Sequence, residues 1–247
     1  MRSGNPALTD KVFTEAPRYA GAGTMTISGT VNKTFLSILL CIASASWTWN
    51  LFFNSGNPQS IMGWLWFGVI GGFVVAMVTI FKKEWAPLTT PTYAILEGFA
   101  LGGISSVFEA QFPGIVIQAV SLTFGTLGAL LLAYKSRLIK VTDNLRLGIV
   151  AATGGIAIVY IIDLILSFFG IRIPMIHESG WLGIGFSVFV VIIAALNLVL
   201  DFDFIERGAE SGAPKYMEWY GAFGLMVTLV WLYLEILRLL SKLSSRK

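Results

Sequence analysis

Hydrophobic residues gather in seven long runs between positions 34 and 240, and short polar stretches that hold most of the charge separate these runs. A run of about 20 apolar residues matches the hydrocarbon thickness of a bilayer. Because no water is available there, the backbone must satisfy its own hydrogen bonds, and each run is predicted to be a helix. The pattern therefore predicts an all-α polytopic membrane protein, a bundle of seven transmembrane helices.

The runs and the segments beside them define the predicted organisation. A polar segment, 1–33, is predicted to be an amino-terminal tail, 34–241 the membrane domain, and 242–247 a short basic tail. Glycine pairs and clusters inside the runs, at 71–72, 98–103 and 154–155, are predicted to let helices approach closely. The predicted membrane helices are 34–53, 62–81, 91–112, 114–134, 147–169, 181–201 and 221–240.

Composition narrows the class of function. The chain is 55% hydrophobic and only 13% charged, and its net charge of +3 is too small to indicate a nucleic-acid partner. A single cysteine, Cys41, and a single histidine, His177, argue against a disulfide framework within the chain and against a histidine-rich metal site. No phosphate loop, Gly-x-Ser-x-Gly or His-Glu-x-x-His pattern occurs in the sequence. We therefore expect neither an enzyme nor a protein with a metal or another cofactor.

Lysine and arginine positions predict the orientation. With the amino terminus in the cytoplasm, the cytoplasmic segments hold most of the 17 basic residues. A seventh crossing nevertheless places a basic cluster on the opposite side, so the last run either crosses the membrane or is a buried or re-entrant helix. That cluster consists of Arg238, Lys242, Arg246 and Lys247.

Charged residues inside the runs are the first candidates for function, since a charge at the bilayer centre costs at least about 2.5–3.5 kcal/mol. Asp201 and Asp203 end the sixth run, and two residues on a helix are about 200° apart, so they face nearly opposite sides. Asp203 lies four residues before Arg207, the spacing of an ion pair on one helix face. We therefore predict that Asp201 faces the interior, with the alternative that both aspartates are ordinary interfacial charges.

Other polar residues extend this set. Glu97 has no basic neighbour in the sequence, and is either part of a polar pathway or a neutral structural carboxyl. Asn197, one turn before Asp201, either lines the same polar seam or only joins helices by hydrogen bonds. Asp163 could pair with Arg172 or reach the headgroups, and Glu235 has Arg238 three residues later.

Three segments of the sequence resemble the Bax inhibitor family, and most of all its bacterial Bax-inhibitor-like branch. They are the stretch from Asn197 to Arg207, with Asp201 and Asp203 inside it, the stretch Tyr216-Met-Glu-Trp-Tyr-Gly-Ala-Phe, and Trp231-Leu-Tyr-Leu-Glu-Ile-Leu-Arg238. Supporting matches begin at Glu97 and at Gly114.

The resemblance implies a seven-helix bundle with the last helix in the centre, and a pH-sensitive calcium leak. In such proteins two aspartates on the sixth and seventh helices share a proton-dependent hydrogen bond, and an arginine at the end of the second helix latches to one of them. Asp201 matches the sixth-helix aspartate, Lys82 falls at the arginine, and Thr228 falls where the second aspartate would be. Since a threonine cannot titrate, the pH switch implied by the resemblance would be altered or absent here.

The leading hypothesis is thus a passive calcium pathway lined by Glu97, Asn197 and Asp201. The expected partners of the protein are the surrounding lipid bilayer, Ca²⁺ and protons. A non-conducting regulator that binds other membrane proteins, such as a quality-control protease, is the alternative, and a proton-coupled transporter is a third. The branch resemblance predicts a bacterial inner membrane, with the amino terminus in the cytoplasm.

Overall fold

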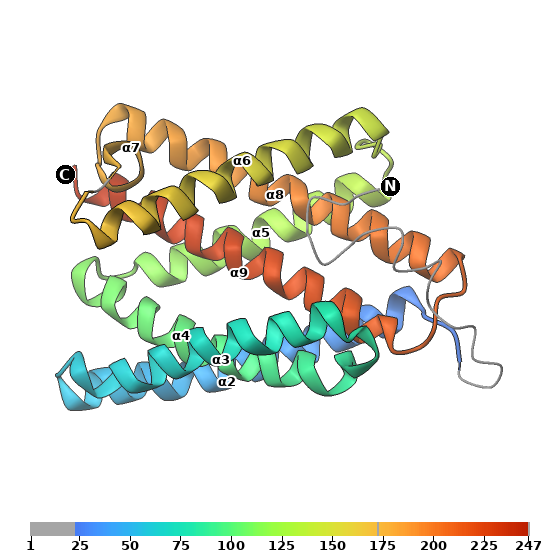
Figure 1. Ribbon diagram of the computed structural model, residues 1–247, viewed down its shortest axis with the longest axis horizontal. Helices are drawn as coiled ribbons and strands as arrows, with labels where there is room; N and C mark the ends of the chain where they lie inside the picture. The colour runs from blue at the N-terminus through green and yellow to red at the C-terminus, as the bar shows by residue number, and fades with distance from the viewer. Residues whose placement is uncertain (1–22, 172, 247) are drawn as a thin grey trace. The chain divides into compact units, whose positions relative to one another are not determined.

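The computed structural model describes residues 23–171 and 173–246, and 85% of these residues are helical. All seven predicted helices are present as long helices, and the fold class is confirmed (Figure 1). A four-residue helix, α7, and a short 3-10 helix, η1, complete the described elements. In order these elements are α2 (Ile27–Ser55), α3 (Gln59–Phe81), η1 (Lys83–Trp85), α4 (Ala86–Gln111), α5 (Ile115–Lys135), α6 (Asp143–Phe168), α7 (Pro174–His177), α8 (Trp181–Glu210) and α9 (Met217–Ser244).

Capping explains where several helices begin and end. Thr26 caps α2 by accepting a hydrogen bond from the Gly29 amide at 3.0 Å, so the helix begins at Ile27, inside the segment predicted as a tail. Gly56 ends α2 in the left-handed region, with φ of 60°. Thr142 caps α6 in the same way as Thr26 caps α2. The described part of the predicted tail is therefore largely the first turns of α2.

Six of the described helices are long and apolar enough to cross a membrane, and α9 is among them. Their outward residues agree with a lipid environment, since large apolar side chains such as Phe73 and Leu132 are 64% and 71% exposed. The most apolar stretch of α9 is 67% buried, compared with 11–22% for α2, α3, α5 and α6. Among these six helices, α9 therefore has the most buried apolar stretch.

The chain divides into two compact units, and α8 and α9 each contribute to both. Among the described residues, one unit contains 114–203 and 228–246, and the other contains 23–113 and 204–227. In the first unit, Ile156 of α6 packs with Val190 and Ile193 of α8, and Trp231 of α9 covers this cluster.

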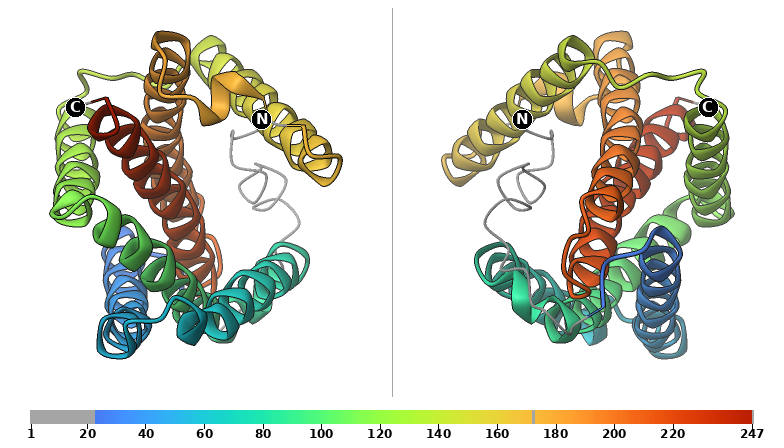
Figure 2. Two further views of the ribbon diagram at one scale, coloured as in Figure 1. Left: turned by 90° about the vertical axis from the view of Figure 1, so that its left-hand side faces the viewer. Right: turned by 90° about the vertical axis from the view of Figure 1, so that its right-hand side faces the viewer.

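In the second unit, α4 packs against both α2 and α3, as the end-on views of Figure 2 show. Glycines make this possible, as the sequence predicted. A Cβ atom on Gly98 would overlap the Ser44 hydroxyl, and one on Gly68 would approach the backbone of α4. Gly154 and Gly155 differ, because no described atom lies within 4 Å of a Cβ there, so the predicted close packing does not occur at that pair.

Candidate functional site

Two polar residues one turn apart on α8 lie in the interior of the first unit. Asp201 is completely buried and Asn197 is 2% exposed. Because the two residues are four apart in the sequence, their side chains lie on one face of the helix. The burial of Asp201 agrees with the prediction that this aspartate faces inward.

The Asn197 amide is held by two hydrogen bonds. Its Nδ2 donates to Thr153 Oγ1 of α6 at 2.8 Å and to the Ile193 carbonyl at 2.9 Å. Within the part of the chain that the structure describes, no donor reaches Asn197 Oδ1, which is buried. The side chain therefore joins α6 to α8 while one acceptor stays open.

Asp203 has a partner that the sequence did not suggest. Arg146, in the first turn of α6, donates from Nη2 to Asp203 Oδ2 at 2.5 Å, and Arg146 is only 5% exposed. The same guanidinium lies 3.8 Å from the exposed carboxylate of Asp143. The sequence pattern assigned no particular role to Arg146, and only the packing of α6 against α8 makes it a buried partner.

Thr228 and Lys82, two further positions to which the family resemblance pointed, differ in their burial. Thr228 on α9 is 3% exposed and belongs to the same unit as Asp201. Lys82 is the exposed residue that ends α3, in the other unit. Thr228 is thus an interior residue without a titratable group, and Lys82 a surface cation.

Glu97 lies on α4 and faces α3. A Cβ atom on Gly72 would lie 3.1 Å from its Oε2, and the Tyr93 side chain, one turn earlier, hydrogen-bonds to it. The glycine makes room for the carboxylate between the two helices. Glu97 therefore occupies a helix interface of the second unit.

A second polar cluster of the first unit surrounds Glu235. Tyr160 donates to Glu235 Oε1 at 2.9 Å, and Arg238 contacts both Glu235, at 3.1 Å, and the Tyr160 hydroxyl, at 2.7 Å. The predicted pairing of Glu235 with Arg238 is confirmed, and Tyr160 is an addition from α6. The third candidate carboxylate, Asp163, accepts a hydrogen bond from the Ile173 amide at 3.1 Å, while Arg172 lies outside the described residues.

Lys242 requires a correction to the predicted basic tail. It lies in the last turns of α9, is 4% exposed, and donates to the Gly183 carbonyl at 3.0 Å and to Ser187 Oγ at 2.9 Å. The helix continues to Ser244 because these contacts with α8 hold its end. Lys242 is therefore an interior cation, and the exposed tail begins only after it.

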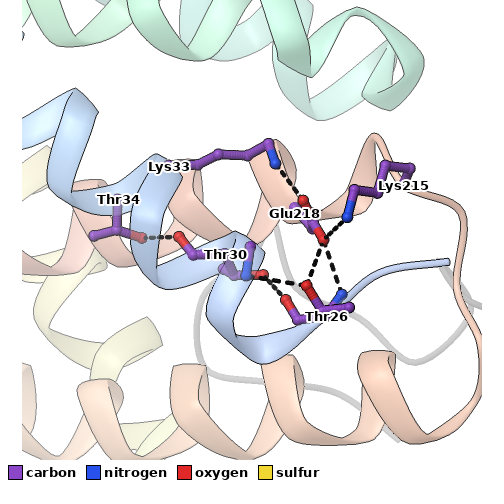
Figure 3. A network of polar contacts seen from close by, with 7 residues as sticks. Thr26, Thr30, Lys33, Thr34, Lys215 and Glu218 are labelled. Carbon is purple, nitrogen blue, oxygen red and sulfur yellow. Dashed lines mark hydrogen bonds and ion pairs between the residues drawn. The ribbon is translucent and has the colours of Figure 1, made fainter. Parts of the chain in front are cut away.

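Sequence reasoning missed the most heavily bonded carboxylate in the described chain. Glu218, in the first turn of α9, is completely buried and accepts from the Thr26 amide at 2.9 Å and from the Thr26 hydroxyl at 2.8 Å. It also pairs with Lys215 at 2.7 Å and with Lys33 (Figure 3). The only local signal was Lys215, three residues earlier.

The polar side chains of these sites offer carboxylate, amide and hydroxyl oxygens and basic nitrogens. Across residues 23–171 and 173–246, no group of three or more His, Cys, Asp or Glu side chains could hold a metal ion. The interior carboxylates lie instead beside amides, hydroxyls and basic side chains. The arrangement can bind cations weakly or stabilise helix packing.

These observations define a polytopic α-helical membrane protein with polar side chains in its interior. The family model described as Bax inhibitor 1 like matches residues 5–245, nearly the whole chain, and the chain belongs to this family. The family is not known as enzymatic. Neither the curated proteins nor the solved structures contain a match to the chain.

Proposed function

We propose that this protein is a passive leak for cations, with calcium as the principal ion, and that Asp201 and Asn197 line its pathway. The observation that carries the proposal is the complete burial of Asp201 inside a helix that is apolar enough to cross a membrane. A carboxylate there is costly, and ionisable residues inside a membrane mark substrate or ion pathways and proton relays.

Calcium suits the available ligands. It takes several oxygen ligands in flexible geometry, and carboxylate and amide oxygens are among those it prefers. One carboxylate and one amide make a weak site, which lets an ion leave as well as enter. Gating is proposed to occur near the cytoplasmic end of α8, where Asp201 and the Arg146–Asp203 ion pair lie.

The pH response is proposed to be that of a single carboxylate. Since Thr228 stands where the family resemblance implies a second aspartate, the pair of aspartates that the resemblance implies is not formed at this position. A Thr228→Asp variant is therefore expected to make calcium flux more steeply dependent on pH than the wild type. An unchanged pH profile in this variant would count against the assigned position of the partner.

Calcium entry into reconstituted liposomes tests the proposal. The Asp201→Asn variant keeps the size of the side chain and removes its charge, and is expected to lower the initial rate by about tenfold or more. Glu178→Gln is the matched control, since Glu178 belongs to the same unit but is exposed. Equal rates in the wild type and Asp201→Asn would overturn the assigned pathway.

Glu97 is a separate candidate in the second unit and is tested by itself with Glu97→Gln. If the wild-type protein conducts no ion, the alternative from the sequence takes the place of the leak, namely a regulator that binds other membrane proteins. Its predicted docking segment, the amino-terminal tail, lies mostly outside the described residues.

A bacterial inner membrane and a cytoplasmic amino terminus belong to the proposal, and cysteine accessibility on both sides of the membrane tests the orientation.

A further inference from the structure

The orientation of the Asn197 amide follows from its surroundings. Of its two neighbours, the Thr153 hydroxyl can donate or accept, but the Ile193 carbonyl can only accept. A flipped amide would place Asn197 Oδ1 against that carbonyl oxygen, and two acceptors repel. The Nδ2 group must therefore face Ile193 and Thr153, and Oδ1 must point elsewhere.

This orientation leaves a buried acceptor that is available to a ligand. Asn197 is 2% exposed, and no described donor reaches its Oδ1. Leaving such a group unsatisfied costs about 1–3 kcal/mol, and a ligand that binds to the oxygen would offset this cost. The fixed amide presents its oxygen on the helix face that also carries Asp201, one turn further along.

We propose that Asn197 Oδ1 is a direct ligand of the permeating calcium ion, and that Thr153 is the positioning residue that keeps this oxygen turned toward the ion. This inference rests on the proposed leak function and deepens it. Asn197 adds an uncharged oxygen to the single carboxylate of Asp201, so the site offers calcium a partial replacement of its hydration without a high negative charge. Asp203 is engaged with Arg146 at 2.5 Å and does not add to the charge of the site.

Thr153 variants separate positioning from packing. Thr153→Val has nearly the same shape but cannot accept the Nδ2 hydrogen bond, whereas Thr153→Ser can. We expect Thr153→Val to lower calcium flux in liposomes by about fivefold, which corresponds to one lost hydrogen bond, and Thr153→Ser to retain most of the flux. Thermal unfolding of each variant in detergent shows that the fold is kept.

Two comparisons distinguish this inference from a general loss of helix packing. In an Asn197→Leu background, Thr153→Val should have no further effect, because the oxygen that it positions is gone. Thr153→Val and Asn197→Leu should each also change the calcium-to-sodium permeability ratio, which a packing defect would leave unchanged. Wild-type flux and selectivity in Thr153→Val, with reduced flux in Asp201→Asn, would overturn the role of Asn197 and leave the leak function intact.

A binding measurement decides the inference even when no flux is observed. Mn²⁺ is paramagnetic and accepts oxygen ligands, so it should broaden the NMR signal of the Asn197 side-chain amide in the wild-type protein. The broadening should be weak in Asp201→Asn and in Thr153→Val. A sharp Asn197 signal at saturating Mn²⁺ would overturn the inference, whereas absent flux with clear broadening would overturn only the leak function.

Discussion

The two interior polar clusters around Glu218 and Asn197 differ in how completely their acceptors are used. In the Glu218 cluster, which comprises Glu218, Thr26, Lys33 and Lys215, one buried carboxylate receives an amide, a hydroxyl and two ammonium groups. In the Asn197 cluster, which comprises Asn197 and Thr153, the amide donates both of its hydrogen bonds and its carbonyl oxygen receives none from the described residues.

This difference separates a stabilising network from a candidate binding site. A buried carboxylate with several donors is compensated for its lost hydration, and it fixes the start of α2 beside the start of α9. The contact is tight enough that a Cβ atom on Gly29 would overlap the Glu218 carboxylate. An acceptor that is buried without a donor lowers stability, at a cost of about 1–3 kcal/mol. We therefore expect changes in the first cluster to affect folding and changes in the second to affect conduction.

The largest effect on stability is expected from Glu218→Ala. The variant leaves the Lys33 ammonium group and the Thr26 hydroxyl without their acceptor, and should lower the free energy of unfolding by about 2–4 kcal/mol. Unfolding by SDS, followed by circular dichroism in mixed micelles, measures this change. A loss below about 0.5 kcal/mol would mean that the network is not a stabilising one.

A smaller loss is expected from Gly29→Ala. The added methyl group must displace the Glu218 carboxylate from its donors, and overpacking of this kind costs about 1–3 kcal/mol. Gly63→Ala is the matched control, because no described atom lies within 4 Å of a Cβ on that helical glycine. Equal unfolding curves for the two variants would contradict the close approach of Glu218 to α2.

Lys215→Ala should have a still smaller effect, between about 0 and 1 kcal/mol. The Lys215 side chain is 51% exposed, so water screens its pairing with Glu218, whereas the Lys33 side chain is 20% exposed. Lys33→Ala is therefore expected to cost more than Lys215→Ala in the same SDS titration. The reverse order would show that exposure does not govern the two ion pairs.

The smallest effect on stability is expected from Asn197→Leu, although this variant should reduce calcium flux strongly. Leucine has a similar size and removes the open acceptor, so the lost bond to Thr153 is offset and the free energy of unfolding should change by less than about 1 kcal/mol. Parallel SDS titration and liposome flux measurements provide the check. A destabilisation as large as that of Glu218→Ala would erase the difference between the two clusters.

Local patterns in the sequence predicted the features that depend on near neighbours. Glu235 and Arg238 pair because three residues place them on one face of α9, and the same periodicity put Asp201 inward. Glycine spacing was informative at Gly98, where a Cβ atom would overlap α2, but not at Gly154, where a Cβ atom would have no such described neighbour within 4 Å. A small residue permits a close approach, and the position of the neighbouring helix decides whether one occurs.

The sequence by itself therefore determined the membrane class, the long helices and the side of α8 on which Asp201 lies, because hydrophobic runs and helical periodicity are local properties. Only the tertiary structure decided that Arg146 meets Asp203, that Lys33 meets Glu218, and that Lys242 is buried against α8. Such partners come from helices far apart in the chain, and the packing of apolar faces selects them without leaving a local signal. The partners of these charged side chains are therefore set by which helices pack together.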